Sequence, residues 1–170
     1  LLLGLDRAQD ARPHLAAAHS LDPRDPDAVT ALALVALSER DAEQALRLFG
    51  EALALNPNDA TLWVQVGTTR AAAGDFTGGI AALKKSLEIA PGFLAARAQL
   101  VAVYREGRRY DEALAELKKL EADAPGNPTI AAERKNVEAA RAAHNKGKVG
   151  GVRLRQILLL DEASAKAALA

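Results

Sequence analysis

The sequence predicts an all-α fold, a right-handed solenoid of about three and a half helical hairpins with a capping helix. The first observation is a spacing: the prolines at 23, 57, 91 and 125 follow one another every 34 residues. A fixed period of about 34 residues is typical of stacked helix–turn–helix units. The second observation is composition. The 170 residues are 49% hydrophobic with only three Phe, two Tyr and one Trp, which suits a folded and mostly helical chain.

Apolar or small residues recur at helical spacing between these prolines, and this pattern predicts the buried stripes of the helices. We expect Trp63 to lie in the core as part of them. The stripes comprise Val29, Leu32, Ala33, Ala45, Phe49, Ala52 and Leu55, then Trp63, Val66, Gly67, Gly79, Leu83, Ser86 and Ile89, and then Leu100, Tyr104, Ala113, Leu117 and Leu120.

Capping residues divide the chain into helices. Asp25 and Asn127 each precede a proline, and an N-cap acceptor followed by proline at the first helical position favours a helix start. Asp41, Asp59 and Asp75 are further candidate caps, and Gly74 and Gly107 are expected to end first helices in the left-handed conformation. We therefore expect the helix pairs 26–38 with 42–54, 60–72 with 76–89, and 93–106 with 110–123.

Proline and glycine positions also predict where the first and last helices of the solenoid begin and end. Residues 1–20 supply the end of an earlier pair, in which a helix starts after Asp10 with Pro13 in its first turn. The predicted solenoid covers 1–145, with a closing helix at 128–145, and a Gly/Lys linker at 146–151 leads to a separate segment at 152–170. The start at a leucine rather than a methionine indicates an excerpt of a longer chain.

Several motifs resemble the tetratricopeptide repeat family over about residues 1–126. They are Trp63-x2-Val66-Gly67, Gly74-Asp75-Phe76, Leu87-x-Ile89-Ala90-Pro91 and Gly107-x2-Tyr110-Asp111-Glu112-Ala113. The repeat-defining positions are Pro23, Pro57, Trp63, Gly67, Pro91, Tyr104, Ala113 and Pro125. The chain departs from the family at Arg70, where an aromatic residue is usual, and at Gly79, where alanine is usual. We therefore expect the second hairpin to pack less tightly than its neighbours.

The resemblance implies a protein-interaction scaffold whose concave groove is lined by the first helix of each pair. The implied groove positions are Asp27, Thr30, Leu34 and Leu37, then Thr61, Val64, Thr68 and Ala71, and then Ala95, Ala98, Ala102 and Arg105. These positions lack the lysine and asparagine with which some members of the family hold a terminal carboxylate. We expect the groove to bind an apolar helix or an extended segment of another protein.

The last residues carry a different pattern. Residues 152–160 have the length and composition of a β-strand, and a short helix is expected to follow. Residues 152–170 resemble the start of a parvulin-type peptidyl-prolyl isomerase, with Gln156 where that family has an active-site histidine. The alternative function is therefore the substrate-gathering or chaperone arm of such a foldase, outside the cytoplasm if this resemblance holds and cytoplasmic otherwise. We also expect the segment 152–160, which includes the four apolar residues 157–160, to dock on the groove or to pair with the same segment of a second molecule.

No catalytic, metal or cofactor site is predicted. Cysteine is absent, and His14, His19 and His144 have no ligand cluster around them. The spacing Gly74-x4-Gly79 lacks the lysine of a phosphate loop. The acidic pairs at 111–112 and 161–162 fit helix starts better than acid–base chemistry.

The charge pattern points to protein partners. Twenty-two basic residues balance twenty-two acidic ones, which disfavours nucleic acid and anionic membranes as partners, and no apolar run is long enough to span a bilayer. Locally, residues 133–155 hold seven basic and two acidic side chains. A solvated face is the first interpretation of this excess, and an acidic protein partner or nucleic acid remain open as alternatives.

Overall fold

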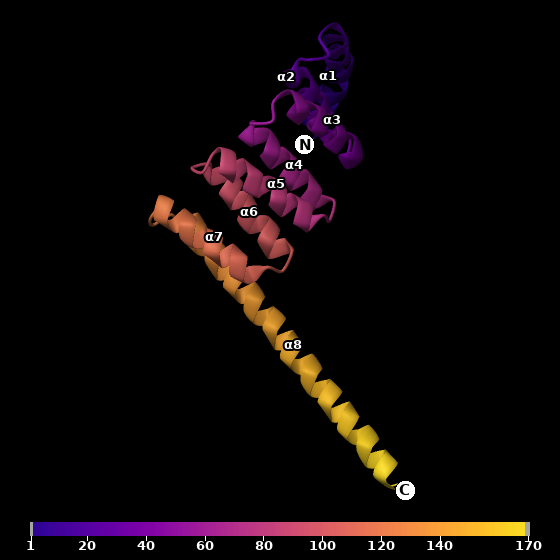
Figure 1. Ribbon diagram of the computed structural model, residues 1–170, viewed down its shortest axis with the longest axis vertical. Coiled ribbons are helices and arrows are strands. Elements are labelled where there is room, and N and C mark those ends of the chain that lie inside the picture. The colour runs from indigo at the N-terminus through magenta and orange to yellow at the C-terminus, as the bar shows by residue number, and fades with distance from the viewer. Residues whose placement is uncertain (1, 169–170) are drawn as a thin grey trace.

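The computed structural model describes the backbone of residues 2–168 and the side chains of residues 10–148. This part of the chain consists of eight α-helices joined by short turns and contains no strand. The helices are α1 (Leu2–Leu21), α2 (Pro26–Ser38), α3 (Ala42–Leu55), α4 (Ala60–Ala72), α5 (Phe76–Ile89), α6 (Leu94–Glu106), α7 (Tyr110–Asp123) and α8 (Pro128–Ala168). Figure 1 shows α1 to α7 stacked in chain order, with α8 packed on α7 and continuing far beyond it. The predicted all-α solenoid is confirmed.

Side-chain caps start four of the helices where the sequence predicts. The carboxylates of Asp25, Asp41, Asp59 and Asp75 accept a hydrogen bond from a backbone N–H two or three residues further on, at 2.8–3.0 Å. Asn127 does the same ahead of α8, where its Oδ1 accepts from the N–H of residue 129. Each cap satisfies one N–H that has no partner inside the helix. The bounds of α2 to α7 agree with the predicted pairs to within one residue, although α6 and α7 start without a side-chain cap.

The two predicted left-handed glycines behave differently. Gly74 ends α4 with φ +87°, as expected, whereas Gly107 has φ −72° and the following Arg108 takes the left-handed conformation with φ 59°. The prediction for Gly107 is therefore wrong. Little space is left for a side chain at Gly107, because a Cβ there would lie 3.2 Å from the carbonyl oxygen of Val103 and 3.5 Å from Phe76.

The buried side chains form two clusters along the solenoid. Phe49, fully buried in α3, belongs to the first cluster, which α2 to α5 build. Leu83, Leu100 and Leu117 belong to the second, which extends from α4 to Val137 in α8. Each hairpin thus covers the apolar face of the next, as a solenoid requires. The predicted stripes are largely buried, but Leu55 is 39% exposed.

Trp63 is half-buried rather than fully enclosed. Its ring packs against the first cluster, and its Nε1 donates a hydrogen bond of 2.9 Å to the carbonyl oxygen of Pro57. The tryptophan at this position therefore packs against the core and also stabilises, through its hydrogen bond, the proline-containing turn that precedes α4.

The second hairpin, α4 with α5, is packed closely, and the expectation of loose packing there is wrong. A Cβ at Gly79 would lie 2.8 Å from the carbonyl oxygen of Gly67, and one at Gly67 would lie 2.7 Å from Cγ of Leu83. Both distances are shorter than packed atoms allow. The glycine that departs from the family pattern brings the two helix backbones together.

Helix α1 begins at Leu2, so the predicted start after Asp10 is wrong. Pro13 lies inside the helix, where it has no N–H to bond the carbonyl of residue 9 and where its ring disfavours a straight helix. Residues 2–21 are rich in alanine and leucine, which favour the helical state. An ion pair between Arg12 and Glu39 links α1 to the end of α2.

Helix α8 does not stop near residue 146, and residues 152–160 are helical rather than a strand. The predicted linker at 146–151 is also helical. A glycine inside a helix costs about 1 kcal/mol relative to alanine, and the Leu, Arg, Gln, Lys and Ala residues nearby are good helix formers. Since the helix runs away from the solenoid in Figure 1, the expected fold-back of residues 157–160 onto the groove is wrong.

The division of the chain into a solenoid (1–145), a linker (146–151) and a further segment (152–170) stays a prediction. Self-association through residues 152–160 also stays a prediction, but these residues are helical, so they would not pair as β-strands.

Candidate peptide-binding groove

An apolar cavity of about 300 Å³ lies among α6, α7 and α8. Helix α6 contributes Ala98, Val101 and Ala102, and α7 contributes Leu117 and Leu120. The first turns of α8 close the cavity with Thr129, Ile130 and Glu133. The volume is at the lower end of the range of ligand pockets, about 300 to 1,000 Å³, and so fits one or two side chains of a bound segment. We call this space the groove cavity.

The charged residues of the groove cavity neutralise one another. Arg105 in α6 lies 2.9 Å from Glu133 in α8, measured from Nη1 to Oε1, with 35% and 28% of the two side chains exposed. The pair joins the two helices across the cavity. A charged ligand would have to compete with this pair, whereas an apolar side chain would meet the methyl groups of the walls.

The predicted groove positions fall into two groups. Ala98, Ala102 and Arg105 line the cavity together. The positions on α2 and α4 do not line it: Leu34 is 44% exposed, and Ala71 is only 5% exposed and belongs to the core. Of the remaining positions there, Thr30, Leu37, Val64 and Thr68 are half-buried, whereas Asp27 and Thr61 are exposed. Ala95 on α6 is also exposed and does not line the cavity.

Thr68 offers no spare hydroxyl donor to a ligand. Its Oγ1 lies 3.0 Å from the carbonyl oxygen of Val64 and 3.1 Å from that of Gln65, one turn earlier in α4. A threonine hydroxyl inside a helix commonly bonds back to the preceding turn in this way. The groove side of α4 at Thr68 and Val64 is therefore apolar in effect, although a threonine lies there.

Six lining residues escaped the sequence reasoning, namely Val101, Leu117, Leu120, Thr129, Ile130 and Glu133. The repeat period could have found Thr129, because it lies 34 residues after the groove position Ala95. Val101, Leu117 and Leu120 are core residues of α6 and α7 that also reach the cavity. Ile130 and Glu133 depend on how α8 packs, since the start of α8 takes the place of the first helix of a further hairpin.

The other chemical candidates are structural residues. Asp111 pairs with Arg141 at 2.8 Å, and Glu112 pairs with Arg109 at 2.7 Å. The hydrogen bond from Arg109 lowers the pKa of Glu112 below its ordinary value, helped by the residue's own N–H, while burial opposes the shift. The lowered pKa of Glu112 favours its ionised form, which does not suit a proton donor.

The histidines are scattered, with His14 and His19 in α1 and His144 in α8. Within the part of the chain that the structure describes, no three His, Asp or Glu side chains gather as metal ligands would. No helix of that part is both long and apolar enough to cross a bilayer.

A stack of helical hairpins with a concave apolar cavity defines a helical-repeat binding protein. Two family models, both described as tetratricopeptide repeat, match the sequence, one at residues 1–60 and 30–93 and the other at 70–132. These ranges cover more than half of the chain. The chain belongs to the tetratricopeptide repeat family.

Among known proteins, the chain is 29% identical over 93 residues to the peroxisomal targeting signal receptor of Saccharomyces cerevisiae. It spans 15% of that receptor's length. Among solved structures it resembles a thermophilic tetratricopeptide protein of Thermus thermophilus, with a TM-score of 0.68 at 25% identity, covering 81% of this chain and 76% of that one. It also resembles the MamA protein, with a TM-score of 0.64 at 25% identity, covering 68% of this chain and 63% of that one.

The resemblance of residues 152–170 to a parvulin-type isomerase is not supported. Its strand is part of α8, and both family models lie within residues 1–132. The strand was its principal feature, so the argument for an isomerase arm loses its structural basis.

Proposed function

We propose that the groove binds an apolar segment of a partner protein and that one or two of its side chains enter the groove cavity. The observation that carries this proposal is the cavity wall. Six apolar side chains from α6, α7 and α8 enclose the space. Burial of apolar surface contributes about 25 cal/mol per Å² removed from water, so a leucine-sized side chain gains from entering.

The groove contributes few unpaired polar groups that would favour a polar ligand. Arg105 and Glu133 bind each other, and the Thr68 hydroxyl is taken by its own helix. A charged segment would lose water without gaining a partner of opposite charge. The exposed Leu34 on α2 adds apolar surface in the first hairpin. These features favour a helix or an extended segment with spaced apolar residues.

A peptide-display library provides a direct test. Peptides enriched on the immobilised protein would be synthesised, and their dissociation constants measured by titration calorimetry. Ala98 is exposed at the cavity wall, so Ala98→Glu places a carboxylate there without entering the core. We expect this variant to weaken binding at least about tenfold, since every 1.4 kcal/mol is a factor of ten.

The matched control is Ala115→Glu, at another exposed alanine, in α7, that does not line the cavity. It should leave the dissociation constant unchanged. Val64→Glu extends the test to the second hairpin, with circular dichroism to confirm folding because Val64 packs against the core. Equal binding by the Ala98→Glu and Ala115→Glu variants, or enrichment of acidic rather than apolar peptides, would contradict the proposal.

A further inference from the structure

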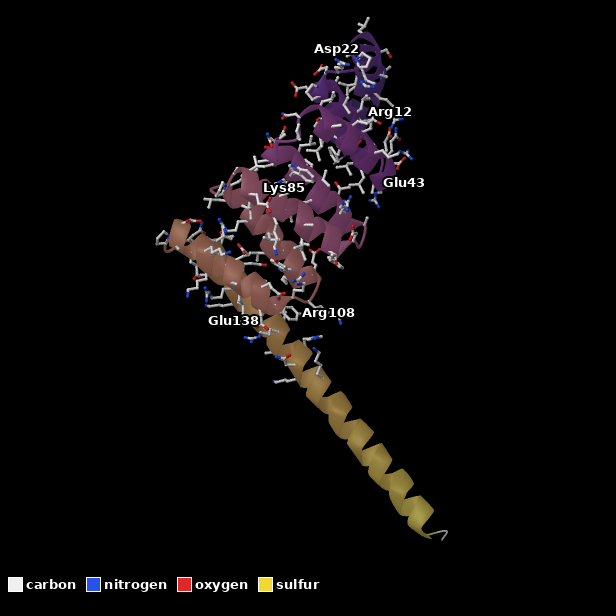
Figure 2. The ribbon with its side chains drawn as sticks, in the orientation of Figure 1. Arg12, Asp22, Glu43, Lys85, Arg108 and Glu138 are labelled. Atoms are coloured by element: carbon white, nitrogen blue, oxygen red, sulfur yellow. The ribbon has the colours of Figure 1, made fainter. Side chains whose placement is uncertain are left out.

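A second cavity, of about 260 Å³, lies where α8 passes the turn between α6 and α7. Arg108 and Arg109 line it from the turn, and Arg141 and Lys148 line it from α8. We call the space bounded by residues 108–112 and 141–148 the basic cleft. Figure 2 shows Arg108 at the edge of the solenoid beside the departing α8.

The length of α8 creates the basic cleft. The helices of the hairpins are 13 or 14 residues long, and a helix of that length starting at Pro128 would end near residue 141. Three of the cleft's polar side chains, His144, Asn145 and Lys148, lie beyond that point. The cleft is therefore a feature of this chain's extended closing helix and not of the repeating unit.

The basic cleft carries an excess of positive charge. Its two carboxylates are already engaged, because Asp111 pairs with Arg141 at 2.8 Å and Glu112 pairs with Arg109 at 2.7 Å. Arg108 and Lys148 are exposed and form no ion pair with any residue whose side chain is described. Four cations against two carboxylates leave a charge of +2 in the cleft.

The surrounding helix reinforces this excess. Residues 134–148 of α8 contain five basic side chains and one acidic side chain, in a chain whose formal net charge is zero. The attraction for an anion is therefore local and directs a ligand to this end of the solenoid. The basic cleft also contrasts with the groove cavity, which is apolar and has its charges paired.

We infer that the basic cleft binds an acidic, extended segment of a partner protein, whose carboxylates pair with Arg108 and Lys148. This inference is independent of the groove proposal, since the two cavities share no lining residue. Carboxylates on a flexible peptide can adjust to the separation of the two cations, and the guanidinium of Arg108 can bind a carboxylate through two N–H groups.

The same residues make nucleic acid the poorer fit. Non-specific binding of single strands combines a long basic track with aromatic rings on which bases stack. The rings of Tyr110 and His144 are half-buried, and their centroids lie 5.7 Å apart, so each already contacts the other. Only two cations of the described cleft remain without an ion pair. A few carboxylates match this arrangement better than a run of phosphates.

Fluorescence anisotropy with a fluorescein-labelled hexaglutamate peptide tests the inference on the full chain. At about 50 mM salt we expect saturable binding that weakens several-fold at about 300 mM, because exposed ion pairs are screened. The double variant Arg108→Glu/Lys148→Glu should weaken binding at least about tenfold. Arg108→Gln/Lys148→Gln, which only removes the charges, should weaken it less and serves as the second variant if reversal disturbs folding.

The matched control is Arg24→Glu/Lys118→Glu, which makes the same change in net charge at two exposed residues outside the basic cleft. It should bind hexaglutamate nearly as the unchanged protein does. Equal loss in the control and the cleft variants would overturn the inference, because net charge alone would then explain binding. Tighter binding of labelled hexathymidylate than of hexaglutamate, or hexaglutamate binding no better than a Gly–Ser hexapeptide, would also overturn it.

Discussion

The backbone of Gly79 in α5 lies directly against that of Gly67 in α4, so that a Cβ on Gly79 would stand 2.8 Å from the Gly67 carbonyl oxygen. The neighbouring Ala71 would lie 3.1 Å from the same Cβ. The obstacle at Gly79 is mainly backbone, which cannot rotate away as a side chain can. The two helices joined by this close approach, α4 and α5, each contribute side chains to both buried clusters.

The first prediction is that Gly79→Ala destabilises the protein although alanine is the better helix former. The favourable propensity change is about 1 kcal/mol, and forcing a methyl group into a packed contact costs typically about 1 to 3 kcal/mol. We expect a net loss in the free energy of unfolding, measured by urea denaturation followed by circular dichroism. Gly50→Ala is the matched control, because Gly50 is an exposed α3 residue whose Cβ would meet nothing within 4 Å. It should be stabilising, and a similar gain at Gly79 would show that the two helices separate readily.

The second prediction concerns Arg97 in α6. Its guanidinium lies 3.0 Å from Glu116 of α7 and donates to the carbonyl oxygen of Pro91 at 2.8 Å, and its side chain is only 14% exposed. Arg97→Met leaves a largely buried carboxylate with Lys119 as its remaining ion-pair partner. We expect a loss of about 1 to 3 kcal/mol in the free energy of unfolding.

A surface ion pair gives the comparison for that variant. Arg47 lies 3.2 Å from Glu43, and both side chains are more than 60% exposed, so Arg47→Met should cost less than about 0.5 kcal/mol. The double variant Arg97→Met/Glu116→Met should recover part of the loss, because it also removes the largely buried carboxylate that Arg97→Met leaves without its arginine. Equal effects of Arg97→Met and Arg47→Met would show that burial of the Arg97 pair is unimportant.

The third prediction concerns the pKa of Glu112, which the hydrogen bond from Arg109 holds below its ordinary value. Removing that bond with Arg109→Gln should raise the Glu112 pKa towards the ordinary value, as followed by NMR titration of its side-chain carboxyl carbon. Lys84→Gln is the control, because Lys84 acts on Glu112 only through a weaker charge interaction. A larger shift from Lys84→Gln than from Arg109→Gln would contradict the assignment of the cause.

The sign of the linked pH effect on stability follows from the direction of the shift. A carboxyl group whose pKa is lower in the folded state stabilises the fold above its unfolded pKa, and this contribution is lost as pH falls through the folded pKa. Acidification through that range should therefore cost the unchanged protein more stability than the Arg109→Gln variant.

Local chemistry, readable from the sequence, determined where five of the described helices begin. The side chains that cap α2, α3, α4, α5 and α8 bond to backbone within two or three residues, so no distant contact is needed to set those starts. The period of 34 residues then established the stacking of the hairpins and, with it, groove positions such as Ala98 and Ala102.

Contacts between separate helices decided what the sequence interpretation missed. Whether a glycine loosens or tightens a hairpin depends on which backbone lies opposite it, and that is why Gly79 was misjudged. The groove cavity needed α8 placed against α6, with Glu133 reaching Arg105, and the basic cleft needed α8 to continue past its expected end. Residues 146–160 include both glycines, which disfavour a helix, and good helix formers, so helix propensity alone did not predict their structure. Because α8 is already formed and docked before this segment, adding further helical residues needs no new nucleation. Short-range hydrogen bonds thus set the helices, while packing over long sequence distances set the two cavities.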